Sequence, residues 1–180
     1  MDPAFVFGYG SLLARGEGTP CRLRGHRRRW GVAMDNRRTI PGYKYFLDPD
    51  GARPDVFVTF LDAVAERGSS VHGVAFGVSA VALGELDARE RNYRRVDVTA
   101  MVDAELGGRV WAYLGLEEAR ERFEAGVRAG TAVVSRAYVE GVRAGFAAFG
   151  LDFDTEPELP VRDLTLVRVP GRGRTSTAAG

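Results

Sequence analysis

The sequence predicts a single α+β domain in which a mixed or largely antiparallel sheet, or a small barrel, packs with about three helices. Strand-like segments recur along the chain, whereas only three segments have the spacing of an amphipathic helix. The two kinds of segment do not alternate regularly, as they would in parallel β-α-β units. The 180 residues, 45% of them hydrophobic, suffice for one core. We assign residues 1–170 to the domain and expect residues 171–180 to form a flexible tail.

Seven segments are expected to form strands, because each combines β-branched or aromatic residues with alternation or a short apolar run. The segment after Gly107 and Gly108 fits the second arm of a hairpin. In chain order the expected strands are residues 5–9, 24–34, 56–61, 71–78, 96–102, 110–114 and 164–169.

Three helices follow from capping residues and apolar stripes. The first begins after Ser79 and runs to about Arg91, the second spans residues 116–127, and the third runs from Ser135 to about Phe149, where Gly150 ends it. The stripes expected to face the core are Leu116, Ala119, Phe123 and Val127 in the second helix, and Tyr138, Val142, Phe146 and Phe149 in the third.

Composition argues against several classes of protein. A formal net charge of +1 is unlike that of a general nucleic-acid or anionic-membrane binder. One cysteine, Cys21, allows no intrachain disulfide, and two histidines make a Cys/His zinc site improbable. The start of the chain lacks the pattern of a signal peptide, and no apolar run is long enough to span a membrane. We therefore expect a cytoplasmic protein, with no metal, nucleotide or flavin implied by any residue pattern.

The stretch "VFGYGSLL", residues 6–13, breaks the first strand with two glycines around a tyrosine. A simple turn explains such a break. A binding loop explains it as well, because glycine lets a ligand approach the backbone closely. The stretch alone does not choose between the two.

Glu90 occupies an unusual place in the first helix. On a helical wheel at about 100° per residue it lies between Leu83 and Leu86, on the apolar stripe. A carboxylate there is costly unless it is paired or protonated, and a partly buried carboxyl group suits general acid or base catalysis. The alternative is a structural ion pair with Arg91, Arg94 or Arg95. Tyr93, at the helix end, can donate a hydrogen bond to Glu90 or to a ligand.

The combination of "YGSL" at residues 9–12 with "LDARE" at residues 86–90 resembles the gamma-glutamylcyclotransferase-like (AIG2-like) superfamily. The resemblance extends to "LRGHRRRWGVAM" from Leu23, "GGRVWAYL" up to Leu114 and "SRAYVEGVRAGFAAFGL" from Ser135. It covers most of the chain, from about residue 5 to residue 151, and implies that family's fold.

The resemblance implies an enzyme that cleaves a γ-glutamyl amide without water. The α-amine of the substrate attacks its own γ-carbonyl, forming 5-oxoproline and releasing an amine or amino acid. Glu90 matches the family's catalytic glutamate, which takes the proton of the α-amine. The residues that match substrate-binding positions of the family are Tyr9, Gly10, Ser11, Leu12, Tyr93 and Tyr113. The leaving group stays open among amino acids, glutathione, amines and antibiotic intermediates. The resemblance slightly favours the amino-acid, glutathione and antibiotic types over simple amines.

Residues 35–53 form a long polar and aromatic connection, and long connections are often functional. From its basic cluster we add Asn36, Arg37 and Arg38 as candidate substrate contacts, because arginine pairs well with carboxylates. A solvated basic loop explains the cluster equally well.

Three other functions remain as alternatives. A serine hydrolase would use Ser11 with His26 or His72, although "GYGSLL" does not fit the G-x-S-x-G turn. A nucleic-acid binder would use the arginines of "RLRGHRRRW", residues 22–30, although strand alternation sends some of them to opposite faces. A non-catalytic binding protein of the same fold is the most serious alternative, because fold does not determine function.

Overall fold

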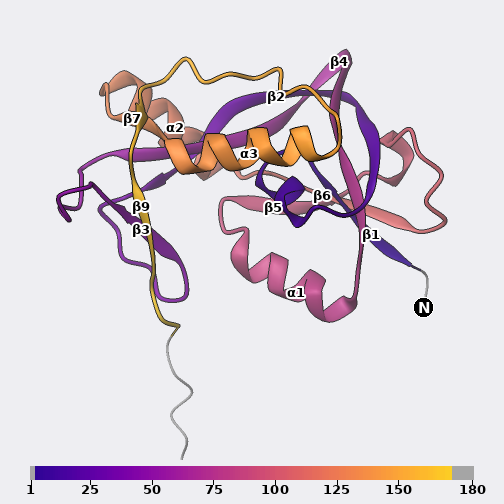
Figure 1. Cartoon of the computed structure of the whole chain (residues 1–180), viewed down its shortest axis with the longest axis horizontal. Coiled ribbons are helices and arrows are strands. Elements are labelled where there is room, and N and C mark those ends of the chain that lie inside the picture. Colours follow the sequence, from indigo (N-terminus) through magenta and orange to yellow (C-terminus); the bar gives the residue numbers. More distant parts are fainter. Residues whose placement is uncertain (1–2, 172–180) are drawn as a thin grey trace, which may run out of the picture.

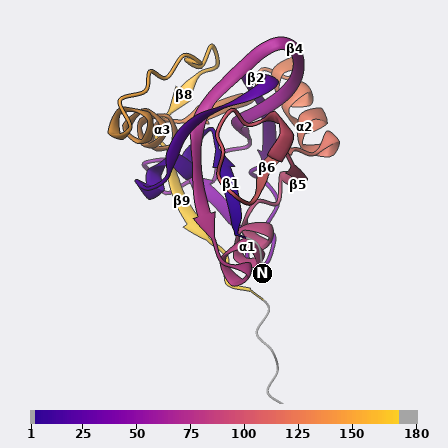
Figure 2. The same ribbon diagram turned by 90° about the vertical axis from the view of Figure 1, so that its right-hand side faces the viewer.

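Two long strands form the framework of the molecule, for which a computed structural model describes residues 3–171. Strand β2 (Thr19–Asp35) pairs antiparallel with β4 (Phe57–Val78) along nearly its whole length. Both strands curve strongly around the shorter ones (Figure 2). The register shifts after Arg24 and again after Trp30, and such bulges bend and twist a strand.

The larger sheet is mixed, as the sequence predicts. At its centre β1 (Ala4–Gly8) lies antiparallel to β4 and parallel to β6 (Arg109–Gly115). The strand order is β5-β6-β1-β4-β7-β8, with β2 paired on β4. The outer strands are β5 (Tyr93–Asp97), β7 (Ala132–Ser135) and β8 (Val161–Arg162).

A separate two-stranded sheet pairs β3 (Lys44–Leu47) antiparallel with β9 (Thr165–Arg168). It stands apart from the larger sheet, with β9 descending beside β3 (Figure 1). The sequence predicts β9 but not β3, which lies inside the stretch expected to be a connection. The short strands β7 and β8 were also missed.

All three predicted helices are present as α1 (Ala80–Arg89), α2 (Glu117–Arg128) and α3 (Arg136–Ala148). The hydroxyl of Ser79 caps α1 by accepting from the N–H of Ala82 at 3.1 Å. Gly150 follows α3 with φ +65°, the left-handed backbone expected there. Helices α2 and α3 lie on opposite sides of the curved strands, and α1 lies below them (Figure 2). No helix within residues 3–171 is long and apolar enough to cross a membrane.

One residue of the predicted apolar stripes is wrong. Val127 of α2 is 48% exposed, and the helix faces the sheet through Ala119, as predicted, and Gly126. A Cβ on Gly126 would stand 2.9 Å from that of Phe57, so only glycine allows this close packing. In the third helix Val142 and Phe146 are buried, and Tyr138 and Phe149 pack against the core, as predicted.

The predicted strand over residues 96–102 ends at Asp97. The Asp97 carboxylate accepts hydrogen bonds from the N–H and hydroxyl of Thr99, which starts a short 3-10 helix (Thr99–Met101). Val98 and Val102 are buried nonetheless. Conversely, the predicted strands over 56–61 and 71–78 merge into β4. Most of the expected tail, residues 172–180, lies outside the described residues.

A buried carboxylate ties three elements together. Asp62 of β4 has no exposed surface and accepts from the N–H of Gly115 in β6 and from Nε of Arg120 in α2, each at 2.8 Å. A Cβ on Gly115 would lie 2.5 Å from Val32 Cγ1 and 2.8 Å from the Asp62 carboxylate. Glycine at this position therefore makes the Asp62 contact possible.

Replacing Gly115→Ala should lower the free energy of unfolding by about 1–3 kcal/mol, because the added methyl overpacks the junction. The matched control is Gly84→Ala, at an open position inside α1, which should raise it by about 1 kcal/mol through helix propensity. Urea denaturation of both variants measures the difference. Equal effects of the two changes would contradict the packing described for Gly115.

Candidate active site

A cavity of about 270 Å³ opens where the end of α1, the β3–β9 sheet and α3 meet. A narrower hollow continues from it over the loop that follows β1. Both share Ser11, Glu90, Tyr93 and Tyr138 in their walls. The structure thus brings together the glycine-flanked turn and the glutamate, which lie about 80 residues apart in the sequence.

Glu90 stands at the C-terminal end of α1 and faces the cavity. Its N–H still donates to the Leu86 carbonyl at 2.8 Å, while its φ and ψ of −84° and 56° leave the helix. The side chain is only 15% exposed, and its carboxylate accepts from Nε and Nη2 of Arg89 at 3.0 and 2.9 Å. The sequence predicts the burial correctly but names the wrong ion-pair partners, since Arg91 and Arg94 make no ion pair with it and Arg95 pairs with Asp87.

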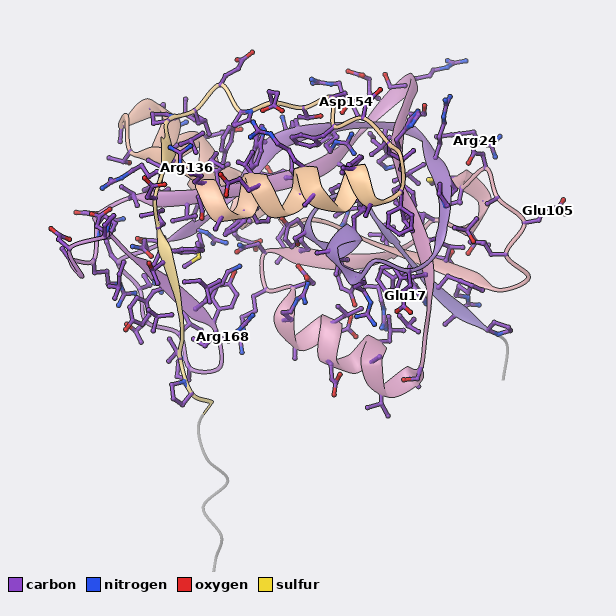
Figure 3. The ribbon with its side chains drawn as sticks, in the orientation of Figure 1. Glu17, Arg24, Glu105, Arg136, Asp154 and Arg168 are labelled. Atoms are coloured by element: carbon purple, nitrogen blue, oxygen red, sulfur yellow. The ribbon has the colours of Figure 1, made fainter. Side chains whose placement is uncertain are left out.

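The loop of residues 9–12 is held from two sides. The Tyr9 hydroxyl donates to the Tyr113 carbonyl at 2.6 Å, and the buried Arg28 guanidinium donates to the Tyr9 carbonyl at 3.3 Å. Arg28 in turn pairs with Asp154 on the segment that passes over α3 (Figure 3). These bonds fix the direction of the peptide that enters the 3-10 helix η1 (Ser11–Arg15).

Gly8 and Gly10 provide space. Neither has a positive φ, so a left-handed backbone is not the reason for glycine at these positions. A Cβ on Gly10 would lie 3.3 Å from the Tyr138 hydroxyl and 3.4 Å from Leu61 Cδ1. A Cβ on Gly8 would stand 2.9 Å from that of Leu12. Gly10 therefore lets the loop approach Tyr138, beside the cavity.

The hydroxyls of the predicted tyrosines are used within the protein. Tyr93 donates to the Leu61 carbonyl at 2.7 Å, and Tyr113 donates to the Asp87 carboxylate at 2.8 Å. Burial raises the pKa of both phenols, and Glu90 contributes to the increase, so both stay protonated donors at neutral pH. Their rings line the narrow hollow, and they shape it while their hydroxyls brace the backbone.

The three predicted contacts on the 35–53 connection have different surroundings. Asn36 has no exposed surface, and its amide bonds to the backbone of Phe46 and Pro54, so this residue holds the connection together. Arg37 pairs with Asp35 and Asp55. Arg38 lines a third hollow, whose wall also includes Glu90 and Tyr93.

Several residues of the cavity were not among the predicted ones. They are Gly42, Tyr43, Lys44, Phe60, Arg89, Arg91, Asn92, Tyr138, Leu166 and Arg168. The ammonium of Lys44 lies 4.4 Å from the centre of the Phe60 ring. Burial lowers the pKa of Lys44 to about 8, although the Glu90 carboxylate acts in the opposite direction. A sequence signal existed, because Lys44 is the single lysine of the chain.

The alternatives find less support in this arrangement. His26 and His72 line neither the cavity nor the hollow that contain Ser11, so the structure offers no histidine partner there. The arginines of residues 22–30 divide between the faces of β2, where Arg28 points inward and Arg27 pairs with Glu66 of β4 at 2.9 Å. Within residues 3–171 no group of three or more His, Cys, Asp or Glu side chains could hold a metal ion.

Residues 6–130 match the family described as "Gamma-glutamyl cyclotransferase, AIG2-like". No curated protein matches the chain.

Similar solved structures include YkqA from Bacillus subtilis, at 18% identity and a TM-score of 0.43, which covers 88% of this chain. This chain spans only 56% of YkqA. Another is described as a gamma-glutamyl cyclotransferase, at 13% identity and a TM-score of 0.43, covering 87% of this chain and 93% of its own. A third is an uncharacterised protein from Homo sapiens, at 14% identity and a TM-score of 0.42, covering 86% and 92% of the two chains.

The Lys44 amine should titrate near pH 8, well below the ordinary value of 10.5, because the cavity wall removes much of its hydration. Glu90→Gln should move the midpoint lower still, since it removes a negative charge that favours the ammonium form. The measurement is the ¹³C shift of the dimethylated amine against pH, assigned with Lys44→Gln. Glu85→Gln, on the exposed face of α1, serves as the control and should leave the midpoint unchanged. A midpoint near the ordinary lysine value would contradict this placement.

Proposed function

The chain belongs to the AIG2-like gamma-glutamyl cyclotransferase family, and on this premise we propose that it cleaves a γ-glutamyl amide by cyclisation, releasing 5-oxoproline and a free amine or amino acid. The observation that carries the proposal is the position of Glu90. A mostly buried carboxylate, paired with Arg89 of the main cavity, faces the same hollow as the loop of residues 9–12.

The reaction needs a base, because the substrate's α-amine is an ammonium ion at neutral pH and cannot attack while protonated. Glu90 takes this proton. The freed amine then forms a bond to the γ-carbonyl carbon and closes the five-membered ring. When the amide C–N bond breaks, Glu90 passes this proton to the leaving nitrogen. The ring nitrogen then loses its second proton, by way of Glu90, to the released amine, which departs as an ammonium ion and leaves 5-oxoproline with its single lactam N–H. The sum of these steps consumes no water and needs no metal or cofactor.

Positioning of the substrate accounts for the rest of the rate acceleration. The amine and the carbonyl react quickly only when the γ-glutamyl chain is curled so that they meet, and a narrow hollow favours this shape. The rings of Tyr93, Tyr113 and Tyr138 border that hollow together with the 9–12 loop. Burial raises the pKa of all three phenols, so they stay protonated at neutral pH.

The loop of residues 9–12 borders the hollow, and we expect its backbone to lie against the γ-glutamyl group, because Gly10 has no side chain in the way. Ser11 then has a positioning role, and the nucleophile belongs to the substrate.

Glu90→Gln should abolish 5-oxoproline release while the protein stays folded, because the amide keeps the shape of the carboxylate but cannot accept the proton. Loss of a general base costs about a hundredfold to ten-thousandfold in rate. Mass spectrometry of 5-oxoproline, across a panel of γ-glutamyl compounds, measures it against Glu85→Gln as the control. Wild-type turnover in the Glu90 variant would refute the mechanism. Binding of γ-glutamyl compounds without turnover by the wild-type protein would favour the non-catalytic alternative.

Ser11→Ala should reduce the rate by less than about tenfold, since it removes only a positioning group, whereas loss of a covalent nucleophile costs several orders of magnitude. The same 5-oxoproline assay measures this, with circular dichroism to confirm folding. Complete inactivity of a folded Ser11 variant would restore the serine-nucleophile hypothesis.

A further inference from the structure

The charges that line the main cavity are unequal. Among residues 3–171, Glu90 is the only acidic residue that lines it, whereas four basic residues do so: Lys44, Arg89, Arg91 and Arg168. The γ-glutamyl half of a substrate carries no net charge, because its α-carboxylate and α-ammonium balance. A cavity with this excess of positive charge instead complements a substrate with an additional negative group.

Two of the four cations are already engaged. Arg89 pairs with Glu90, and Arg91 donates to the Pro41 carbonyl at 3.3 Å. The side chains of Lys44 and Arg168 differ, because neither makes a hydrogen bond or ion pair with any residue between 3 and 171. Arg162, which precedes β9 in the chain, is in contrast paired with Asp48.

Lys44 and Arg168 stand directly opposite each other in the two-stranded sheet. They are register partners on β3 and β9, so their Cα atoms are neighbours across the ladder. Figure 3 shows Arg168 on β9, across from α1. Both side chains line the same cavity, and together they form what we call the basic wall.

Of the main cavity and the narrow hollow, the basic wall borders only the main cavity, where it is joined by Ser11 of the 9–12 loop and by Glu90. Lys44 and Arg168 border the main cavity but not the narrow hollow over the loop, whereas Glu90 borders both. A substrate with its γ-glutamyl half in the hollow therefore extends past Glu90 into the main cavity. Its leaving group then meets the basic wall.

We propose that Lys44 and Arg168 bind a carboxylate on the leaving group, so that the preferred substrates are γ-glutamyl amino acids or short γ-glutamyl peptides rather than γ-glutamyl amines. This assignment rests on the proposed cyclotransferase function. Arg168 lies outside the residues that match the family, so half of the basic wall comes from a segment that the family match does not include.

The environment of Lys44 gives the contact a physical reason. Its ammonium is packed against the Phe60 ring and has lost part of its hydration, which costs free energy that an unpaired cation does not recover. An incoming carboxylate restores the interaction, and charge-assisted hydrogen bonds are the stronger ones in proteins. A cationic leaving group would instead meet two like charges.

The test uses two substrates that differ by one carboxylate, γ-glutamylalanine and γ-glutamylethylamide. The wild-type protein should cleave the first with a kcat/KM at least about tenfold higher, the effect of one charge-assisted contact. γ-Glutamylputrescine, whose leaving group is cationic, should be the poorest of the three. Equal kcat/KM values for the first two compounds would overturn the assignment while leaving the cyclotransferase function intact.

Variants show which half of the substrate the basic wall binds. Lys44→Gln and Arg168→Gln should each lower kcat/KM for γ-glutamylalanine about tenfold and leave γ-glutamylethylamide nearly unchanged. Arg168→Glu should reverse the order and favour γ-glutamylputrescine. Arg136→Gln is the matched control, because this arginine is exposed at the start of α3 and does not line the cavity (Figure 3). A parallel loss on both substrates would instead assign the wall to the γ-glutamyl half and refute the proposal.

Calorimetric titration with γ-glutamylalanine and γ-glutamylethylamide separates the proposed cyclotransferase function from the proposed role of the basic wall. Tighter binding of γ-glutamylalanine that depends on Lys44 and Arg168, without release of 5-oxoproline from any compound, would overturn the proposed function and support the basic wall. Arg168 is exposed, so the Arg168 variants should fold. They keep the test decisive if the Lys44→Gln variant does not fold.

Discussion

The arrangement of the site depends on two adjacent residues of β4, Leu61 and Asp62. The Asp62 carboxylate holds β6 and α2 through Gly115 and Arg120, while the Leu61 carbonyl accepts the Tyr93 hydroxyl. An isolated buried carboxylate is costly, but this one has a guanidinium and an N–H as partners. These two residues of β4 thereby fix the turn that carries Glu90 relative to the 9–12 loop. Gly10 of that loop lies close to the Leu61 side chain.

Three tyrosines around Glu90 have a structural role that their residue type does not reveal. Tyr9 and Tyr93 donate to backbone carbonyls and Tyr113 to a carboxylate, so these three hydroxyls brace the walls. Burial raises the pKa of all three phenols, which keeps each one a donor. The cavity is therefore rigid where the γ-glutamyl group is proposed to bind. Its charged residues lie mainly on the other side, where substrates are expected to differ.

Local patterns in the sequence predict most of the fold, and they fail where pairing is long-range. The helices follow from caps such as Ser79 and from apolar spacing, and Glu90 stands out because it breaks that spacing. The long strand β4 could not be foreseen, because a glycine followed by two serines, as at Gly68, is typical of a turn. Here Gly68 has φ +85° near the register shift, while β2 continues past it. Lys44 was missed because its importance depends on β9, more than a hundred residues away in the sequence.

The separation of the two sheets has a consequence for how such a protein can diversify. Within the described chain, β3 and β9 pair only with each other, whereas the 9–12 loop and the strands that hold it belong to the larger sheet. Side chains on the small sheet can therefore change without loss of any hydrogen bond in the larger one. A substitution on β3 or β9 can thus alter which molecules enter the cavity and leave the proposed base and its surroundings in place. The boundary between the two sheets separates the part of the wall that is free to vary from the part that the larger sheet holds.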